Sequence, residues 1–302
     1  MDYNLSQNKY NEIFSYYQKG EYKNVEKIIG FGDIHGDLKA FKNCLKKAKL
    51  INSSGKWIGG KTHVVQVGDI LDRKPRHDDF SDEDSEFLII GYILKLQIES
   101  YLSGGGYHPV IGNHELMNVL GIFDYVSHMG MNHFRNFNER KTYFSPGNEF
   151  CQYLACGWNP VIKINNCLFC HGGISKSISM KYSIQDINEK MRSTLYHTNS
   201  NLYAPEFQNL FIGEHSILWD RTYSIDEEEK KNIDDQLKFV LNKYKSKYLI
   251  LGHTPYSEGI KVKYNGRVIC VDTAMSSAFG KKKNIYDRIH FIEISKNKII
   301  IK

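Results

Sequence analysis

The stretch Gly32-Asp33-Ile34-His35-Gly36-Asp37 directly follows an apolar run, 27–31, that has the β-branched and aromatic character of a short buried strand. Its two glycines permit a sharp turn at the end of that strand. If the chain stays extended for three residues, Asp33 and His35 project to the same side and can face one cation. Alone, such a pair is more often a hydrogen-bonded surface pair than a pair of metal ligands.

The same arrangement, an apolar run that ends in a polar turn containing glycine, recurs four times. The turns are Gly68-Asp69-Ile70-Leu71-Asp72-Arg73 after 64–67, Gly112-Asn113-His114-Glu115 after 109–111, His171-Gly172-Gly173 after 167–170, and Gly252-His253-Thr254-Pro255 after 248–251. In open α/β sheets, ligands collect beyond the carboxyl ends of the strands. The five turns can therefore converge on one crevice with enough ligands for two metal ions.

In this order, the motifs GDIHGD, GDILDR, GNHE, HGG and GHT resemble the calcineurin-like metallophosphoesterase superfamily, and within it the phosphoprotein phosphatases. The pairs Met117-Asn118 and Tyr125-Val126, and the stretch Val271-Asp272-Thr273-Ala274-Met275-Ser276, are similar to the Shewanella-like protein phosphatase branch. The resemblance covers residues 28–280, and five ordered motifs are far more specific than any one of them.

The resemblance implies an α/β fold, a four-layer αββα sandwich in which two mixed β-sheets are flanked by helices. We expect one metallophosphoesterase catalytic domain over residues 27–302, which is an ordinary size for one domain. Residues 1–26 are expected to be an N-terminal extension with a helix over 11–19 and no chemistry of their own.

The family pattern also implies the metal ligands. Asp33 and His35 complete a first metal, Asn113, His171 and His253 bind a second, and Asp69 bridges the two. Bridged cations lie about 3.5 to 4 Å apart in two-metal sites, where one hydroxide is activated while the phosphoryl oxygens are held. Mixed oxygen and imidazole ligands suit Mn, Fe or Zn, and the sequence does not choose among these three.

The remaining roles follow from the same resemblance. His114 is the expected general acid, oriented by Asp72, and Arg73, Arg221 and Asn113 are expected to bind the substrate phosphate. The implied mechanism is in-line attack of a metal-bound hydroxide on a phosphomonoester, without a phosphoenzyme. The family usually has glycine after the arginine of the second motif, whereas this chain has Lys74, which we expect to add a cation beside the phosphate.

The resemblance therefore indicates a protein serine/threonine phosphatase whose partner is a phosphorylated protein or peptide. A phosphotyrosine-preferring phosphatase remains an alternative, and so does a dinucleoside polyphosphate hydrolase on the same scaffold, although GNHE and HGG favour the protein phosphatases. A non-enzymatic scaffold would lack ligands, whereas all six ligand positions are filled. No tyrosine motif of toxin-sensitive members follows, which implies resistance to those inhibitors.

Composition and charge limit the other partners and locations that this chain could have. The formal charge of +6 and pI near 8.8 come from basic residues spread among acidic ones, so we expect no nucleic-acid partner. No apolar stretch is long enough to span a membrane, and a cytoplasmic location is expected. Cys167 and Cys170 resemble half a zinc site, but within a strand they face opposite sides, so a shared metal is not expected. The sequence names no regulatory subunit.

Several elements are predicted by pattern alone. Apolar spacing indicates a helix over 38–49, and another helix is expected over 86–102. A Glu-rich start and a Lys-rich end indicate a helix over 226–245. An Asn-Gly turn at 265–266 and Lys296-Asn297 indicate two hairpins. The acidic stretch 78–86 is interpreted as capping of the helix after it, or else as a rim that selects basic substrates. Residues 127–160 show no clean period, and we expect them to form an excursion over the rim of the site with histidines that are not ligands.

Overall fold

The computed structural model describes residues 5–77, 82–225, 231–280, 285–296 and 298–302. It contains two mixed β-sheets. The strands of the six-stranded sheet lie in the order β1-β5-β6-β7-β9-β8 and comprise Glu21–Tyr22 (β1), Val161–Ile164 (β5), Cys167–Cys170 (β6), Tyr248–Leu251 (β7), Lys261–Lys263 (β8) and Val268–Cys270 (β9). In this sheet, β6, β7 and β9 run parallel to one another.

The five-stranded sheet has the order β11-β10-β2-β3-β4. Its strands are Lys27–Phe31 (β2), His63–Gln66 (β3), Gly106–Pro109 (β4), Ile292–Ser295 (β10) and Lys298–Ile301 (β11). The strands β2, β3 and β4 are parallel, and β10 pairs antiparallel with both β2 and β11. Each sheet therefore has three parallel strands whose carboxyl ends lie together.

A layer of aliphatic and aromatic side chains lies between the two sheets, which pack face to face. It includes Ile28 and Val65 from the five-stranded sheet, and Phe169 and Ile250 from the six-stranded sheet. Residues of alternate parity along the same strands, such as Ile29 and Leu249, belong to the larger core beneath the helices. Both faces of each sheet are thus covered, as near-continuous apolar strands require.

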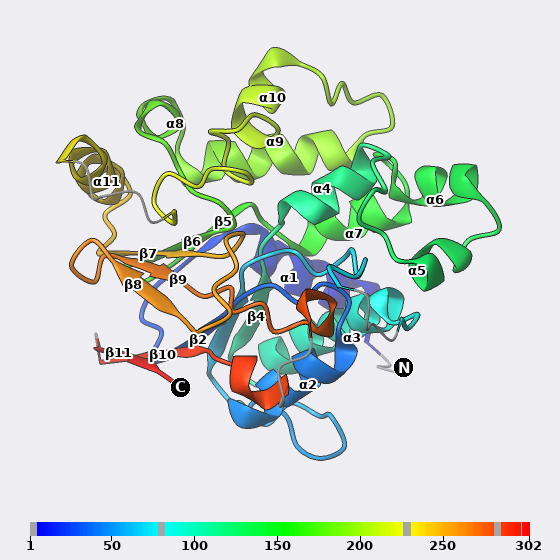
Figure 1. Cartoon of the computed structure of the whole chain (residues 1–302), viewed down its shortest axis with the longest axis horizontal. Coiled ribbons are helices and arrows are strands. Elements are labelled where there is room, and N and C mark those ends of the chain that lie inside the picture. Colours follow the sequence, from blue (N-terminus) through cyan, green and yellow to red (C-terminus); the bar gives the residue numbers. More distant parts are fainter. Residues whose placement is uncertain (1–4, 78–81, 226–230, 281–284, 297) are drawn as a thin grey trace.

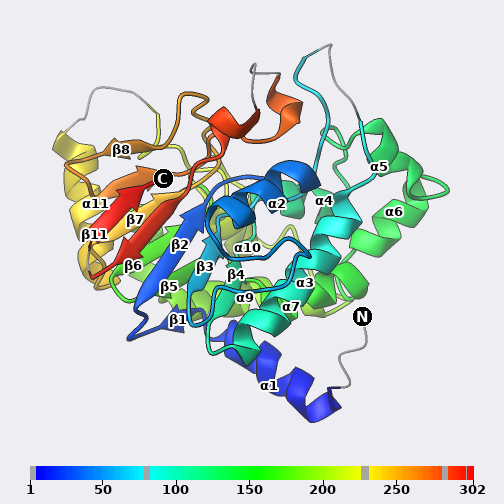
Figure 2. The ribbon, with the colours of Figure 1, turned by 90° about the horizontal axis from the view of Figure 1, so that it is seen from below.

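Helices cover the outer faces of both sheets, as Figures 1 and 2 show. The α-helices are Gln7–Gln18 (α1), Leu38–Lys47 (α2), Glu86–Leu102 (α3), Asn113–Val119 (α4), His128–Asn132 (α5), Phe137–Phe144 (α6), Glu149–Gly157 (α7), Lys176–Lys181 (α8), Ile184–Tyr196 (α9), Pro205–Phe211 (α10) and Lys231–Lys243 (α11), and the short 3₁₀ turns are Ser277–Phe279 (η1) and Ile285–Arg288 (η2). In Figure 1, α2 and α3 lie on the side of the five-stranded sheet, and α8, α9 and α10 lie on the other side. The predicted four-layer fold is confirmed.

Most of the predicted elements are confirmed with small shifts of their ends. Helices α2 and α3 fall where they were predicted, and α11 covers most of the described part of the predicted 226–245 helix. Both hairpins form, because β8 pairs with β9 and β10 with β11. Cys167 lies in the layer between the sheets and Cys170 in the outer core, as expected for strand neighbours three apart, and all six cysteines are free thiols.

The prediction for residues 127–160 was incomplete, because this segment forms helices α5, α6 and α7. They are short, and their buried positions are set by packing on other helices: α7 packs against α1 and α9. A weak period in the sequence is expected where a helix buries several faces at once. Their histidines are not ligands: His133 pairs with Asp84 at the surface, and His128 bonds Asn132.

The described part of the N-terminal segment is packed into the domain. Ile13 and Tyr17 of α1 are buried against α3, and β1 forms an edge of the six-stranded sheet through its pairing with β5. The Tyr17 hydroxyl donates to the carbonyl of Gln97 at 2.7 Å. The segment therefore contributes to the hydrophobic core. The domain boundary at residue 26 stays a prediction. None of the helices in the described ranges is long and apolar enough to cross a lipid bilayer.

A neutral histidine pair lies beneath α1. The Nε2 of His108 is 3.0 Å from Nδ1 of His63, and both rings pack beside Tyr16 and Tyr22. Burial lowers the pKa of His63 to about 4 and holds the pKa of His108 well below its ordinary value. Between these values and the ordinary pKa near 6.5, the unfolded chain binds more protons than the folded protein, so stability falls as the pH falls.

We expect protonation linked to His63 alone to remove about 3 kcal/mol of unfolding free energy between pH 6.5 and pH 4. The measurement is urea denaturation at a series of pH values, which gives the slope of stability against pH. His63→Gln should have a shallower slope than the wild type, because one titrating group is lost. His133→Gln, at an exposed site, is the control and should keep the wild-type slope; equal slopes for all three proteins would contradict this interpretation.

Candidate metal centre and active site

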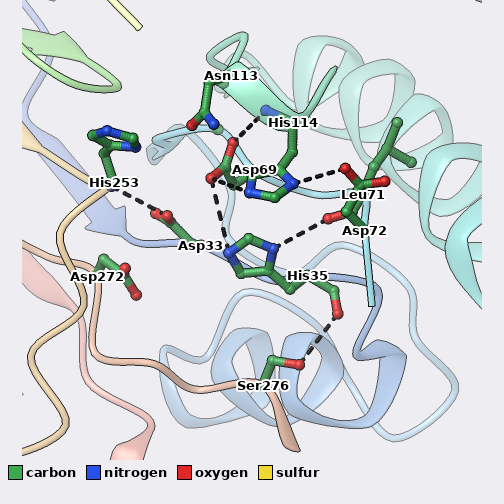
Figure 3. A network of polar contacts seen from close by, with 12 residues as sticks. Asp33, His35, Asp69, Leu71, Asp72, Asn113, His114, His253, Asp272 and Ser276 are labelled. Carbon is green, nitrogen blue, oxygen red and sulfur yellow. Dashed lines mark hydrogen bonds and ion pairs between the residues drawn. The ribbon is translucent and has the colours of Figure 1, made fainter. Parts of the chain in front are cut away.

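Each sheet contributes three strands that are parallel to one another, and the carboxyl ends of all six strands lie at the same edge of the molecule's core. Strands β2, β3 and β4 lead to Asp33, Asp69 and Asn113, and β6, β7 and β9 lead to His171, His253 and Asp272. Figure 3 shows most of these side chains turned toward one another in a single cluster. The convergence predicted from the strand ends is therefore present, and Asp272 joins it as a residue for which no role had been predicted.

The first turn reaches this geometry differently from the prediction. The chain does not stay extended, because His35 has a φ of 42° and Gly36 a φ of 63°, both in the left-handed region. The turn is held by the β3 loop: the backbone N–H groups of Ile34 and His35 donate to the carbonyl of Asp69 at 2.9 and 3.0 Å. Asp37 then caps α2 by accepting from the N–H of Ala40. His35 is aimed at Asp69 by this tight turn, and not by strand alternation.

The second turn depends on one buried carboxylate, that of Glu115. Its Oε1 accepts from the N–H groups of Ile70 and Leu71 at 2.8 and 3.1 Å, and its Oε2 accepts from those of Asp69 and Gly112 at 3.0 and 2.8 Å. It thereby ties the loop after β3 to the first turn of α4. Asp69 is held in the left-handed region at φ 53°, with its Oδ1 accepting from the N–H of His114.

Three imidazoles face Asp69 with the same orientation. Their Nδ1 atoms are occupied by partners behind them: His35 by the carbonyl of Leu71 at 3.2 Å, His171 by that of Val67 at 2.7 Å, and His114 by the Asp72 carboxylate at 2.7 Å. Their Nε2 atoms lie 3.8, 3.1 and 3.8 Å from Asp69 Oδ2 for His35, His171 and His114, respectively. A histidine fixed through one ring nitrogen presents the other toward a cation or a substrate.

These residues form two groups with metal-ligand spacing that share Asp69. One consists of His35, Asp69 and His114, the other of Asp69, His171 and His253, and within each group the candidate ligand atoms lie within 4.8 Å of one another. The amide oxygen of Asn113 lies 2.8 Å from His171 Nε2, next to the second group. The shared carboxylate is that of Asp69, the residue predicted to bridge two cations. The first group, however, contains His114, the predicted general acid, and not Asp33, the predicted ligand.

The electrostatic environment of the buried carboxylates also favours the binding of cations. Burial raises the pKa of Asp33 well above its ordinary value, and the nearby Asp272 and Asp69 carboxylates raise it further. Asp33 Oδ1 is buried and accepts no hydrogen bond from the described residues, while Oδ2 accepts from the N–H of His253 at 3.1 Å. A buried, partly unsatisfied carboxylate among other carboxylates is costly unless positive charge lies beside it. The residues present therefore fit divalent metal ions.

The imidazoles divide according to their surroundings. Burial lowers the pKa of His35 to about 3, with His114 acting in the same direction, and burial lowers that of His253 to about 2, with His171 acting likewise. For His114, burial is outweighed by Asp69 and Asp72, which raise its pKa to about 9. These shifts leave His35 and His253 neutral and favour the protonated form of His114. At His171, burial is likewise outweighed by the charge and hydrogen bond of Asp69, which raise its pKa.

A chain of buried groups positions Asp72 behind His114. Its Oδ1 accepts from Asn118 Nδ2 at 2.8 Å, and its backbone N–H donates to Glu86 at 2.7 Å. The guanidinium of Arg140, which is fully buried, donates to Asn118 Oδ1 at 2.7 Å and to Glu86 Oε2 at 3.3 Å. Glu86 is thus part of this network and is not a simple helix-capping charge; residues 78–81 of the acidic stretch lie outside the described residues.

A cavity of about 1020 Å³ opens over the cluster, with the aromatic residues Tyr125, Trp219 and Phe279 in its wall. Among the described residues that line it, the arginines are Arg76 and Arg221. Arg221 donates to the carbonyl of His253 at 3.3 Å, beside the candidate metal ligands, and the family resemblance implied a phosphate-binding role for it.

The side chains of Arg73 and Lys74 do not line this cavity. The guanidinium of Arg73, which is 4% exposed, donates to the carbonyl of Gly36 at 3.0 Å and lies 3.4 Å from Asp37 Oδ2. Lys74 Nζ donates to the carbonyl of Asp124, so the expected extra cation beside the phosphate is not seen in this arrangement. The side chain of Arg73 does not line the cavity. Its phosphate-binding role stays a prediction from the family resemblance.

Sequence reasoning missed six residues of this site. They are Arg76, Glu86, Glu115, Asn118, Arg140 and Asp272. Asp272 follows β9 at the same sheet edge as the ligands, so the strand-end argument applied to one more strand would have found it. Glu115 and Asn118 lie three and six residues after Gly112 in α4, but Arg140 is brought in only by tertiary packing.

Comparison with known proteins agrees with this geometry. A family model described as calcineurin-like phosphoesterase matches residues 26–257. The chain is 33% identical over 270 residues to Shewanella-like protein phosphatase 1 of Plasmodium berghei (strain Anka), covering 87% of this chain and 71% of that one. It is 28% identical over 299 residues to Shewanella-like protein phosphatase 2 of Arabidopsis thaliana, covering 84% and 73%.

Among solved structures, the fold is similar to that of a cold-active protein-tyrosine phosphatase of a psychrophilic Shewanella species. The TM-score is 0.77 at 24% identity, covering 93% of this chain and 79% of the other. A protein serine/threonine phosphatase from Saccharomyces cerevisiae gives a TM-score of 0.59 at 16% identity, covering 99% and 89%. At these identities the likeness concerns the fold alone.

The fold and the paired ligand groups define a metallophosphoesterase. The chain belongs to the calcineurin-like phosphoesterases, and its relatives within them are the Shewanella-like protein phosphatases. It is thus a hydrolase of the phosphatase class, as the sequence motifs indicated.

The structure predicts a large effect for Glu115→Gln. An amide in place of this carboxylate offers fewer acceptor sites to the four N–H groups and turns a donor toward some of them. We expect the unfolding free energy to fall by roughly 3 kcal/mol, measured by urea denaturation in the presence of a metal chelator. Glu258→Gln, at an exposed carboxylate, is the control and should change stability by less than about 0.5 kcal/mol. Equal stabilities of the two variants would show that Glu115 does not hold the loops.

Proposed function

We propose that this protein is a metal-dependent phosphomonoester hydrolase that acts on phosphoserine and phosphothreonine in proteins or peptides. The observation that carries the proposal is the position of Asp69, whose carboxylate is shared by two groups of side chains with metal-ligand spacing at the base of a cavity. Such sharing is the requirement for two cations that act on one phosphoryl group.

In this proposal, Asp33, His35 and Asp69 hold one divalent cation, and Asp69, Asn113, His171 and His253 hold the other. Both sets mix carboxylate or amide oxygen with imidazole, which suits Mn, Fe or Zn. When bound, such cations supply a nucleophilic water at neutral pH and neutralise the developing charge of the phosphoryl group. Asp272 supplies further negative charge beside Asp33.

The residues around the cations perform the rest of the reaction. His114 carries a proton on the nitrogen that faces the cavity, and Asp72 fixes the ring by accepting from Nδ1 at 2.7 Å. The departing alkoxide of serine or threonine needs that proton, because it is a strong base. Arg221 and Asn113 bind phosphoryl oxygens, and water attacks the phosphorus directly, so no phosphoenzyme forms.

The choice of substrate is supported by the names of the relatives. The two curated relatives are called protein phosphatases, which supports a phosphorylated protein as the partner. The Shewanella structure is called a protein-tyrosine phosphatase, so phosphotyrosine is the competing substrate. A dinucleoside polyphosphate remains the alternative outside proteins, and the cytoplasmic location remains a prediction from the sequence.

The reaction is tested with His114→Asn in protein loaded with Mn²⁺. Hydrolysis of a phosphoserine peptide should fall by about 10²- to 10⁴-fold, the range that a general acid contributes. Hydrolysis of p-nitrophenyl phosphate should fall less, because nitrophenolate leaves without needing a proton. Asp69→Asn should reduce both activities and the bound metal measured by elemental analysis.

His133→Asn, at a surface histidine paired with Asp84, is the matched control and should keep wild-type rates and metal content. Wild-type turnover by His114→Asn on the phosphoserine peptide would contradict the assignment of the acid. Wild-type protein should release phosphate from phosphoserine and phosphothreonine peptides faster than from phosphotyrosine peptides or a dinucleoside tetraphosphate, and the reverse order would replace the proposed substrate class.

A further inference from the structure

The loop after Asp72 is fixed on both sides, which decides where its two arginines point. The backbone N–H of Lys74 donates to the carbonyl of Tyr125 at 2.9 Å, and that of Arg76 donates to the carbonyl of Ala278 at 2.8 Å. His77 Nε2 lies 2.9 Å from the carbonyl of Ser277. The loop is thus tied to η1 and to the segment after α4, and residues 73 and 76 have separate surroundings.

Arg73 is committed to structural partners. Besides Gly36 and Asp37, its Nη2 donates to Ser277 Oγ at 3.0 Å and lies 3.2 Å from Glu83 Oε1. Asp37 is 2% exposed and also caps α2 and accepts from the N–H of Ser277. If Arg73 turned into the cavity, Asp37 would lose its buried cationic partner, which is a costly change.

Of these two arginines, Arg76 is the one that borders the cavity. It lines the cavity together with His35 and His114, and its guanidinium carbon lies 5.2 Å from the ring centroid of Tyr125 and 5.1 Å from that of Phe279. The same two rings pack on the imidazoles: Tyr125 is 5.1 Å from His114, and Phe279 is 5.1 Å from His35. One N–H of Arg76 is used by the carbonyl of Lys74, and a guanidinium has five.

We propose that Arg76, and not Arg73, is the guanidinium that binds the substrate phosphoryl group on the side of His35 and His114, facing Arg221 on the side of His253. This inference rests on the proposed function, because it assigns a substrate contact to the same site. The two rings hold the planar guanidinium by cation–π contact, which orients its N–H fork before substrate binds. Burial lowers the pKa of Arg76, and the Asp72 and Asp69 carboxylates act against it, so the guanidinium lies within the electrostatic field of the candidate site.

The test compares Arg76→Ala, Arg76→Lys and Arg73→Lys in Mn²⁺-loaded protein at equal metal content. The first readout is the affinity for inorganic phosphate, measured by isothermal titration calorimetry. The second is kcat/KM on p-nitrophenyl phosphate. Loss of one bidentate charged contact should weaken phosphate binding and kcat/KM by roughly 10- to 100-fold in Arg76→Ala, with partial recovery in Arg76→Lys.

Thermal unfolding separates the two arginines. Arg76 is exposed, so its variants should unfold within a degree or two of the wild type, whereas Arg73→Lys should lower the midpoint by several degrees and weaken phosphate binding less than Arg76→Lys. Arg135→Ala, which removes an exposed arginine paired only within α6 and its entry, is the control and should match the wild type in both readouts.

Unchanged phosphate affinity in Arg76→Ala would overturn the proposal, and so would a larger loss in Arg73→Lys than in Arg76→Lys. If the wild-type protein hydrolyses no phosphomonoester, the proposed function fails. The calorimetric comparison then still decides whether Arg76 or Arg73 holds phosphate, because it does not depend on turnover.

Discussion

The four hydrogen bonds accepted by the Glu115 carboxylate are the interaction on which the site depends. They join the loop after β3 to the start of α4, and so place Asp69 and His114 on one rigid unit. Burial and the charge of Asp69 raise the pKa of Glu115 to about 7, against the effect of those same N–H groups. The surroundings of Glu115 therefore disfavour its negative charge. Its contribution is the geometry of the two loops that its hydrogen bonds hold together.

The convergence of the candidate ligands could be predicted from the sequence because their positions follow from local rules. Each lies just after an apolar strand, and glycine marks the turn, so the meeting of Asp33, Asp69, Asn113, His171 and His253 needed only the principle that parallel strand ends meet. Their assignment to two cations came from the family resemblance. The reason for the position of His35 was predicted wrongly, since a left-handed turn was taken for an extended strand end. The side chain is in the expected place, but the backbone that aims it is a product of the bonds to Asp69.

Long-range partners explain what could not be predicted. Arg73 and Arg76 are three residues apart in one loop, and they are distinguished by their tertiary partners, among them the buried Asp37 for Arg73 and the rings of Tyr125 and Phe279 for Arg76. Arg140 comes from a segment whose periodicity is too weak to assign a buried face. A fully buried guanidinium bonded to two groups that hold Asp72 is visible only once the helices are packed.

Four residues at the centre, His35, Asp69, Asp72 and His253, hold left-handed backbone conformations that cost non-glycine residues of order 1 kcal/mol or more each. This cost adds to the mutual repulsion of the buried carboxylates. Both costs are present in the folded protein without ions, and in the proposed two-cation site the compensating attraction is added only when the ions bind. The proposal therefore implies that the supply of divalent cations affects the lifetime of the protein, because a chain without its metals unfolds more readily and is more exposed to proteases.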